Sequence, residues 1–156
     1  MNILVVYYSN SGNTKSVAEA VAAKCSGDIE SITDLKKRQG GFAYLLAAIG
    51  SFLRQETQIK GPEKNPDQYE LVVLGTPVWS WNLTPAMRSY IRQQSDKFSR
   101  LAFFCTEGGA GEERVFKQMA DLCGKQPIAT LAIKEQEIKS GTHSQKIEVF
   151  VSTLLS

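Results

Sequence analysis

The sequence predicts an α/β domain built on a doubly wound, five-stranded parallel sheet with helices on both faces. Short apolar runs alternate with amphipathic segments along the chain, as expected when crossover helices join parallel strands. The run Leu71–Leu74 is continuously apolar, which is typical of a parallel strand covered on both faces. Right-handed crossovers bring the carboxyl ends of such strands to one edge of the sheet, where ligands bind.

The composition is that of a single globular domain spanning residues 1–156, with 42% hydrophobic and 22% charged residues. A net charge of +2 gives no reason to expect a nucleic-acid partner. No apolar run is long enough for a transmembrane helix, and the N-terminus lacks a signal-peptide pattern. Cys25, Cys105 and Cys123 are odd in number and widely spaced, so we expect reduced thiols in a cytoplasmic protein. The single histidine, His143, cannot build a histidine-rich metal site.

The first part of the chain opens with an apolar strand over residues 3–8. A helix is predicted from Asn13 to Ser26, because apolar residues recur there at four-residue spacing, and Gly27 is its expected stop. A short second strand is predicted from Asp28 to Ile32.

The stretch between residues 36 and 61 combines a basic cluster, Lys36–Arg38, with an amphipathic segment from Gly41 to Leu53. The helical spacing of its apolar residues predicts a helix packed on the sheet as the second crossover. A membrane-surface or partner-binding role is the alternative, since the basic cluster adjoins the apolar face. A loop is expected over Gly61–Pro66.

The second part of the chain continues the alternation. Three further strands are predicted, at Tyr69–Gly75, Leu101–Cys105 and Ile128–Ile133. Helices are predicted at Pro85–Gln94 after the N-cap Thr84, from Glu112 to a stop at Gly124, and near the C-terminus with Ile147, Phe150, Val151 and Leu154 on its apolar face. The residues from Glu135 to Thr142 are expected to form a loop.

The most informative stretch is the first segment, Ser9–Thr14, between the first strand and the first helix. The free N–H groups and dipole of a helix N-terminus favour a bound anion, and the three hydroxyls of this segment add neutral donors. It contains no lysine, so it is not a nucleotide-triphosphate loop. The alternative is an ordinary turn with a Ser or Asn N-cap.

Two more polar or glycine-rich segments follow strands. The second segment, Thr76–Asn82, contains Trp79 and Trp81, and at least one of these indoles is expected to cover a flat ligand. The third segment, Thr106–Gly111, lets backbone groups approach a planar edge at Gly108 and Gly109. The alternatives are a tryptophan that packs the second segment onto the next helix, and a tight turn at the glycines.

The first segment matches the [ST]-x-[ST]-G-x-T pattern of the flavodoxins at Ser9, Ser11, Gly12 and Thr14, and the other two segments extend the resemblance over nearly the whole chain. The chain resembles a short, microbial flavodoxin-like protein. This resemblance implies the strand order 2-1-3-4-5 and FMN as cofactor. The residues that it implies for FMN binding are Ser9, Asn10, Ser11, Gly12, Asn13, Thr14, Thr76, Pro77, Val78, Trp79, Ser80, Trp81, Asn82, Thr106, Glu107, Gly108, Gly109 and Gly111.

The function that follows from the resemblance is electron transfer by an FMN flavoprotein, with a redox protein or a small-molecule acceptor as partner. The alternative is an FMN-dependent NAD(P)H:quinone-type oxidoreductase. It arises because Ser80 and Trp81 occupy the region where many flavodoxins have a glycine, and because the third segment lacks the usual aromatic residue. A flavin-free interaction module is the third reading, and the intact first segment argues against it.

Overall fold

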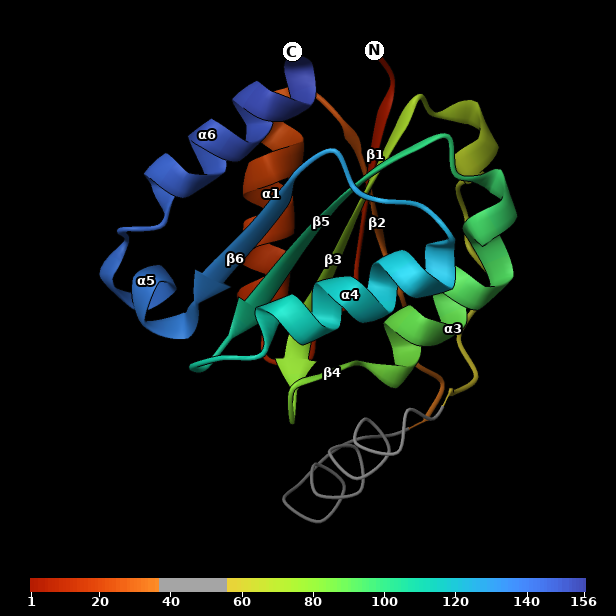
Figure 1. Ribbon diagram of the computed structural model, residues 1–156, viewed down its shortest axis with the longest axis horizontal. Coiled ribbons are helices and arrows are strands. Elements are labelled where there is room, and N and C mark those ends of the chain that lie inside the picture. The colour runs from red at the N-terminus through yellow and green to blue at the C-terminus, as the bar shows by residue number, and fades with distance from the viewer. Residues whose placement is uncertain (37–55) are drawn as a thin grey trace.

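The computed structural model describes residues 1–36 and 56–156, and Figure 1 shows a parallel sheet between two layers of helices. The parallel strands lie in the order β2-β1-β3-β5-β6, and the short β4 pairs antiparallel with β3. This is the predicted order, with β4 added. The strands are β1 (Ile3–Tyr7), β2 (Asp28–Ser31), β3 (Leu71–Trp79), β4 (Asn82–Leu83), β5 (Arg100–Glu107) and β6 (Thr130–Lys134).

The helices cover both faces of the sheet, as predicted. In Figure 1, α1 and α6 lie on one face and α3 and α4 on the other, while both termini lie at the end opposite the β3–β4 hairpin. The helices of the described residues are α1 (Asn13–Cys25), α3 (Pro85–Gln94), α4 (Glu112–Cys123), α5 (Glu135–Ser140) and α6 (Ser144–Leu155). Short 3₁₀ turns occur at Pro66–Gln68 and Ser95–Lys97.

Two apolar cores follow from the alternation of side chains along the strands. Ile3 and Val5 of β1 pack toward α1 and α6, whereas Leu4 and Val6 pack toward α3 and α4. The predicted apolar face of the last helix, α6, is buried in the core between the sheet and α1. β1 is apolar on both faces, as expected of a strand that helices cover on both sides, and it lies inside the sheet between β2 and β3.

The predicted stop of α1 is wrong by one residue. Ser26, not Gly27, adopts the left-handed conformation, with φ 53°, and its N–H bonds to the carbonyl of Ala22. A Cβ on Gly27 would lie 3.1 Å from the carbonyl oxygen of Ile3. Gly27 therefore permits close packing against the start of β1, a requirement that the local sequence does not reveal. The predicted stop of α4 at Gly124 is confirmed, with φ 64°.

Two strands are longer than predicted, and one predicted loop contains a helix. β3 continues past Gly75 to Trp79 because β4 supplies a partner for its end, and β5 continues past Cys105 to Glu107 because β6 extends beside it. The expected loop Glu135–Thr142 contains the helix α5. Its first turn is closed by the Glu137 carboxylate, which accepts the N–H of Lys134 at 2.8 Å.

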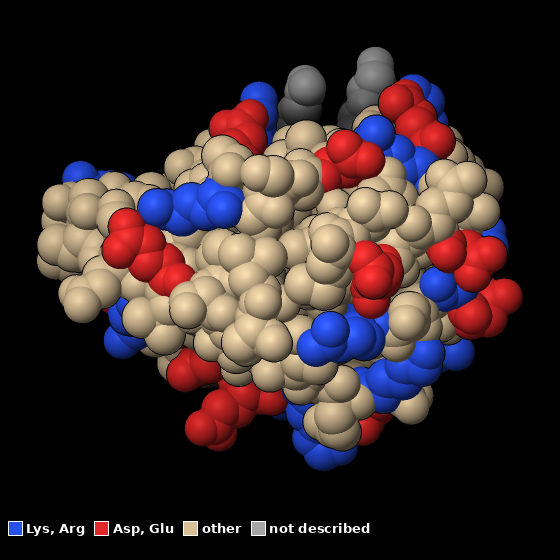
Figure 2. Space-filling view, turned by 90° about the horizontal axis from the view of Figure 1, so that it is seen from above, with Lys and Arg blue, Asp and Glu red and all other residues tan. Residues whose placement is uncertain are grey.

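Several sequence expectations concern the chain as a whole. The cysteines Cys25, Cys105 and Cys123 are free and buried. Within residues 1–36 and 56–156 no helix is both long and apolar enough to cross a membrane. The amphipathic segment Gly41–Leu53 lies outside the described residues. Seen from the end that carries both termini, acidic and basic side chains are interspersed (Figure 2), in keeping with the small net charge.

Gly75 provides a test of the packing between β3 and β5. A Cβ at this position would overlap the ring of Phe104, which is fully buried. We expect Gly75→Ala to lower the free energy of unfolding by about 1–3 kcal/mol, because the ring has no free space into which to move. Urea denaturation followed by circular dichroism measures the effect.

The matched control is Gly61→Ala, at an exposed glycine whose Cβ would meet nothing within 4 Å. We expect this control to change the free energy of unfolding by less than about 0.5 kcal/mol. Equal stability of the two variants would contradict the packing of Phe104 against Gly75.

Candidate functional site

The three segments singled out in the sequence meet at one edge of the sheet. They follow or extend β1, β3 and β5, which are neighbours, and the register aligns Tyr7 with Gly75 and Pro77 with Thr106. The hydroxyls of Thr14 and Thr106 lie 2.7 Å apart and join the first segment to the third. The predicted convergence of these residues is therefore present in the structure.

The first segment leads into α1 through a glycine. Gly12 occupies the N-cap with φ 100°, and its N–H donates to the hydroxyl oxygen of Ser9 at 3.1 Å. The first bond of the helix runs from the N–H of Ser16 to the carbonyl of Gly12 at 3.0 Å. No side chain caps this helix, so the alternative of a Ser or Asn N-cap is wrong. The N–H groups that precede Ser16 lack acceptors within the helix, and such groups can donate to a bound anion.

Thr14 and Thr106 form a buried hydroxyl pair, exposed by only 1% and 3%. Each hydroxyl has one hydrogen and two lone pairs. When one hydroxyl donates to the other, the second retains a hydrogen that has no acceptor within the pair. The pair can therefore bridge the two segments and still donate one hydrogen bond to a ligand. Ser11, in contrast, has an exposed side chain.

The second segment is a hairpin and not the expected loop. Its two turn residues, Ser80 and Trp81, have φ of 50° and 58°, which makes a tight turn of type I′. Such turns favour Asn and Gly, and each left-handed residue of another type costs on the order of 1–3 kcal/mol. Backbone strain of this kind is concentrated at functional sites, so it supports a functional role for the hairpin.

A side chain of α4 holds this hairpin in place. The Gln118 carbonyl oxygen accepts the N–H of Leu83 at 2.9 Å, and its NH₂ group donates to Asn82 Oδ1 at 2.8 Å. Asn82 in turn donates to the carbonyl of Ser80 at 2.8 Å. Sequence reasoning missed Gln118. The only available signal was a polar residue beside the apolar stripe of a predicted helix, which does not identify its partner.

The two tryptophans have different surroundings. Trp79 is exposed by only 8% and packs edge-on against Tyr8, with ring centroids 5.7 Å apart. Trp79 is thus a packing residue, but the aromatic ring that it contacts is that of Tyr8 after β1, whereas the alternative named the next helix. Trp81 is exposed by 61%, at the tip of the hairpin. A Cβ on Gly111 would lie 2.5 Å from Trp81 Cδ1, so the second and third segments also touch.

The third segment pairs exposed glycines with a buried acid. Gly108 and Gly109 are exposed, and a Cβ on either would meet nothing within 4 Å. Glu107, directly before them, is exposed by only 3%, and its Oε2 has no hydrogen-bond partner among the described residues. Burial raises the pKa of Glu107, and the hydrogen bonding and negative charge of Glu112 raise it further. A neutral Glu107 would place less negative charge at this edge of the sheet than an ionised one would.

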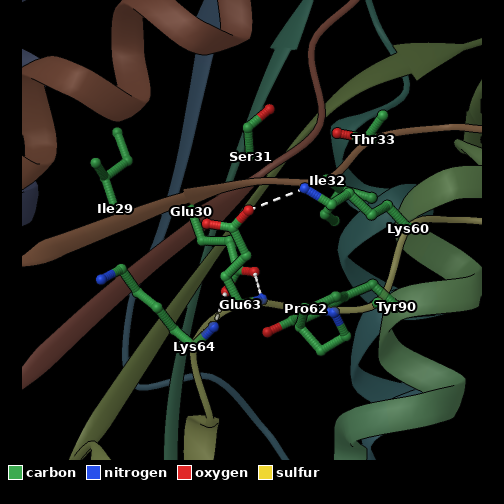
Figure 3. Close-up of a pocket in the computed structure, with 11 residues that line it drawn as sticks. Ile29, Glu30, Ser31, Ile32, Thr33, Lys60, Pro62, Glu63, Lys64 and Tyr90 are labelled. Atoms are coloured by element: carbon green, nitrogen blue, oxygen red, sulfur yellow. Dashed lines mark hydrogen bonds and ion pairs between the residues drawn. The ribbon is translucent and has the colours of Figure 1, made fainter.

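A separate cavity of about 240 Å³ lies between β2, the residues 60–64 and Tyr90 of α3 (Figure 3). The Glu30 carboxylate accepts the N–H groups of Glu63 and Lys64 at 2.6 and 3.3 Å. Lys60 pairs with the carboxylate of Glu63 at 3.0 Å. These charged groups are already engaged in hydrogen bonds with the backbone or in an ion pair with one another. The candidate site is therefore the sheet edge where the three segments meet, called the three-segment edge below.

The comparisons with known proteins concern the fold. No family model matches the chain. A Lactobacillus acidophilus flavoprotein, solved in complex with FMN, superposes with a TM-score of 0.74 at 18% identity, over 90% of this chain and 98% of that one. A candidate flavoprotein from Bacteroides eggerthii gives a TM-score of 0.73 at 19% identity, over 96% and 97% of the two chains.

Three flavodoxins also superpose on the chain, with lower TM-scores of 0.55 to 0.57. Oxidised flavodoxin 2 of Bacillus cereus gives a TM-score of 0.57 at 16% identity, over 97% of this chain and 99% of that one. At these identities the similarity is one of fold, and it shows that the chain has a flavodoxin-like fold. The fold predicted by resemblance is thus confirmed.

The support of the hairpin by Gln118 can be tested directly. In Gln118→Ala the buried N–H of Leu83 and the amide oxygen of Asn82 lose their partner. An unpaired buried polar group costs about 1–3 kcal/mol, so we expect a loss of at least that size in the free energy of unfolding. Urea denaturation measures it, and tryptophan emission at the hairpin reports the local change.

Gln145→Ala makes the same substitution at an exposed position of α6 and serves as control. We expect the control to retain the stability and emission of the unchanged protein. If Gln118→Ala behaved like this control, the hairpin would not depend on the Gln118 contacts.

Proposed function

We propose that the chain binds FMN at the three-segment edge and works in electron transfer. The observation that carries this proposal is the first segment, where a glycine N-cap leaves the N-terminus of α1 open and the Thr14–Thr106 pair joins it to the third segment. Bound FMN would supply the redox chemistry by taking up and releasing electrons at its ring. The protein would supply binding, orientation and the surrounding charge.

The phosphate of FMN fits the first segment because its donors are neutral and preorganised. The dipole of α1 and the N–H groups of its first turn favour a dianion without a charged side chain. Ser11 adds an exposed hydroxyl, and the Thr14–Thr106 pair retains one hydrogen for a phosphate oxygen. The open space around Gly12 allows the phosphate to approach the backbone closely.

The flavin ring fits between the second and third segments. Trp81 offers an exposed indole face at the tip of a strained hairpin, which matches a flat apolar ring. Gly108 and Gly109 leave the backbone of the third segment accessible for hydrogen bonds to the polar edge of the ring. The Lactobacillus acidophilus flavoprotein, which has the same fold, was solved with FMN and thereby supports this choice of ligand.

We favour an electron carrier over an enzyme because the described residues form one small α/β layer structure with little beyond the fold itself. Its partner would be a redox protein or a small-molecule acceptor. The free, buried cysteines lead us to infer a cytoplasmic location. The alternative is an FMN-dependent NAD(P)H:quinone-type reductase. It is favoured by the small residues of the third segment, which leave room beside the ring.

The phosphate assignment predicts that FMN binds much more tightly than riboflavin. Two hydrogen bonds to a charged phosphate, at about 1.5 kcal/mol each, correspond to roughly a hundredfold difference in affinity. Titration of the apoprotein with each flavin, followed by flavin fluorescence, gives both dissociation constants. Ser11→Ala should weaken FMN binding by about 1–2 kcal/mol and leave riboflavin binding unchanged.

Ser16→Ala, at an exposed position one turn into α1, is the matched control and should bind both flavins as the unchanged protein does. Equal affinities for FMN and riboflavin would rule out the first segment as the phosphate site.

The carrier assignment predicts how the bound flavin responds to reductants. Hydride transfer requires a nicotinamide ring in contact with the flavin, and in our arrangement the Trp81 indole covers the exposed ring face. We therefore expect dithionite to bleach the flavin absorbance, whereas NADH and NADPH leave it unchanged over the same time. Anaerobic absorption spectra make the measurement. Rapid bleaching by NADPH, with turnover of a quinone, would instead identify an FMN-dependent reductase.

A further inference from the structure

Glu107 is an unusual residue for the end of a central strand. Its side chain is almost fully buried, yet it carries an ionisable group whose Oε2 has no hydrogen-bond partner in the described part of the chain. A buried, isolated carboxylate is strongly destabilising, and a buried carboxyl group in its neutral form is far less so. The buried Glu107 carboxyl group is therefore more stable in its protonated, neutral form.

The neighbouring charges decide whether that proton is retained. Glu112, in the first turn of α4, has a lowered pKa, first because of hydrogen bonding by its own backbone N–H and then because of the Glu107 side chain. Its Oε2 also accepts the N–H of Gly111 at 3.1 Å. Two groups lower the pKa of Glu107. One is the N–H of Glu112, and the other is Lys134, which lies opposite Glu107 in the register of β5 and β6. The nearby Cys105 thiol is buried and has a raised pKa, so it adds no charge.

The two acids therefore stand at the two ends of one short loop. Glu107 precedes Gly108 and Glu112 follows Gly111, and these glycine-rich residues between them are the part of the third segment that faces solvent. The loop is anchored at its far end by the Gly111–Glu112 bond and has exposed, unconstrained glycines in its middle. A change of charge at the acid pair would act directly on its shape.

We propose that Glu107 and Glu112 share one proton, carried by Glu107, and that this proton holds the loop 108–111 in its ligand-binding shape. Glu107 is thus a positioning residue for the site. With the proton in place, the neutral Glu107 carboxyl and the ionised Glu112 carboxylate lie together without repulsion. When the proton is released to solvent, the buried Glu107 carries a negative charge next to that of the partly exposed Glu112. The lowest-cost response is for the loop to open and admit water.

The first measurement needs no flavin. Glutamate-labelled full-length protein is titrated with pH, and NMR follows the side-chain carboxyl carbons and the ¹⁵N shifts of Gly108, Gly109 and Gly111. The carboxyl resonance of Glu107 is assigned as the one that disappears in Glu107→Gln. We expect its titration midpoint to lie above the ordinary pKa of a glutamate. The glycine shifts should follow the same midpoint. In Glu107→Gln, which mimics the neutral acid, the glycine shifts should stay at their low-pH positions throughout.

Two further variants separate this role from a merely structural one. Glu112→Gln removes the negative charge beside Glu107, so the midpoint of Glu107 should move down, and this variant keeps the test valid if Glu107→Gln fails to fold. Glu113→Gln removes an exposed acid from the same helical turn and should leave the midpoint unchanged. An ordinary midpoint for Glu107, or glycine shifts that do not follow it, would overturn the proposal.

The second measurement rests on the proposed function and uses FMN. If FMN binding requires a protonated Glu107, the affinity for FMN should fall about tenfold per pH unit above the Glu107 midpoint. Glu107→Gln should abolish this decline. Ionisation of the FMN phosphate affects both proteins equally and cancels in the comparison. A wild-type decline that persists in Glu107→Gln would overturn the role in binding. If FMN fails to bind at every pH, the proposed function is wrong, and the NMR titration still decides the proton-sharing pair.

Discussion

Backbone hydrogen bonds hold β3 between β1 and β5, and this pairing brings the ends of the three strands to one edge of the sheet. The close packing of Phe104 over Gly75 is part of the same arrangement, because any side chain at Gly75 would overlap the ring. Each candidate segment then needs only a short extension to reach its neighbours. The Thr14–Thr106 bond and the contact of Gly111 with Trp81 are consequences of strand order.

The site differs in rigidity from one segment to the next. The hairpin is strained at Ser80 and Trp81, and its shape persists because Gln118 and Asn82 tie it to α4 with well-formed hydrogen bonds. In the third segment, exposed glycines lie between Glu107 and Glu112, and no side chain of the described residues is seen to tie them down as Gln118 ties the hairpin. A flat ligand held at this edge would therefore meet a fixed aromatic face on one side and an adjustable backbone on the other. A fixed hairpin on one side and an adjustable glycine-rich backbone on the other suit a site that closes on its ligand.

Charge is distributed sparingly around the candidate site. The first segment relies on N–H groups, hydroxyls and a helix dipole, so it can favour an anion without introducing a fixed positive charge. Glu107, the buried acid of the third segment, has its pKa raised by burial and by Glu112. Reduction of a bound flavin would add negative charge at this edge, and a neutral Glu107 would oppose that change less than a carboxylate would. The raised pKa of Glu107 and the uncharged first segment thus both keep the fixed charge at this edge of the sheet low.

Local patterns in the sequence predicted the helices on both faces and the three segments at the strand ends, because periodicity and strand-to-helix boundaries are local properties. The strand order came from the family resemblance and not from any local pattern. The three-dimensional structure was needed to show that β3 continues into a hairpin, that Trp79 is packed while Trp81 is exposed, and that Gln118 supports the turn. It also showed Glu107 buried beside Glu112. Each of these depends on which residues distant in the chain become neighbours, and no local pattern carries that information.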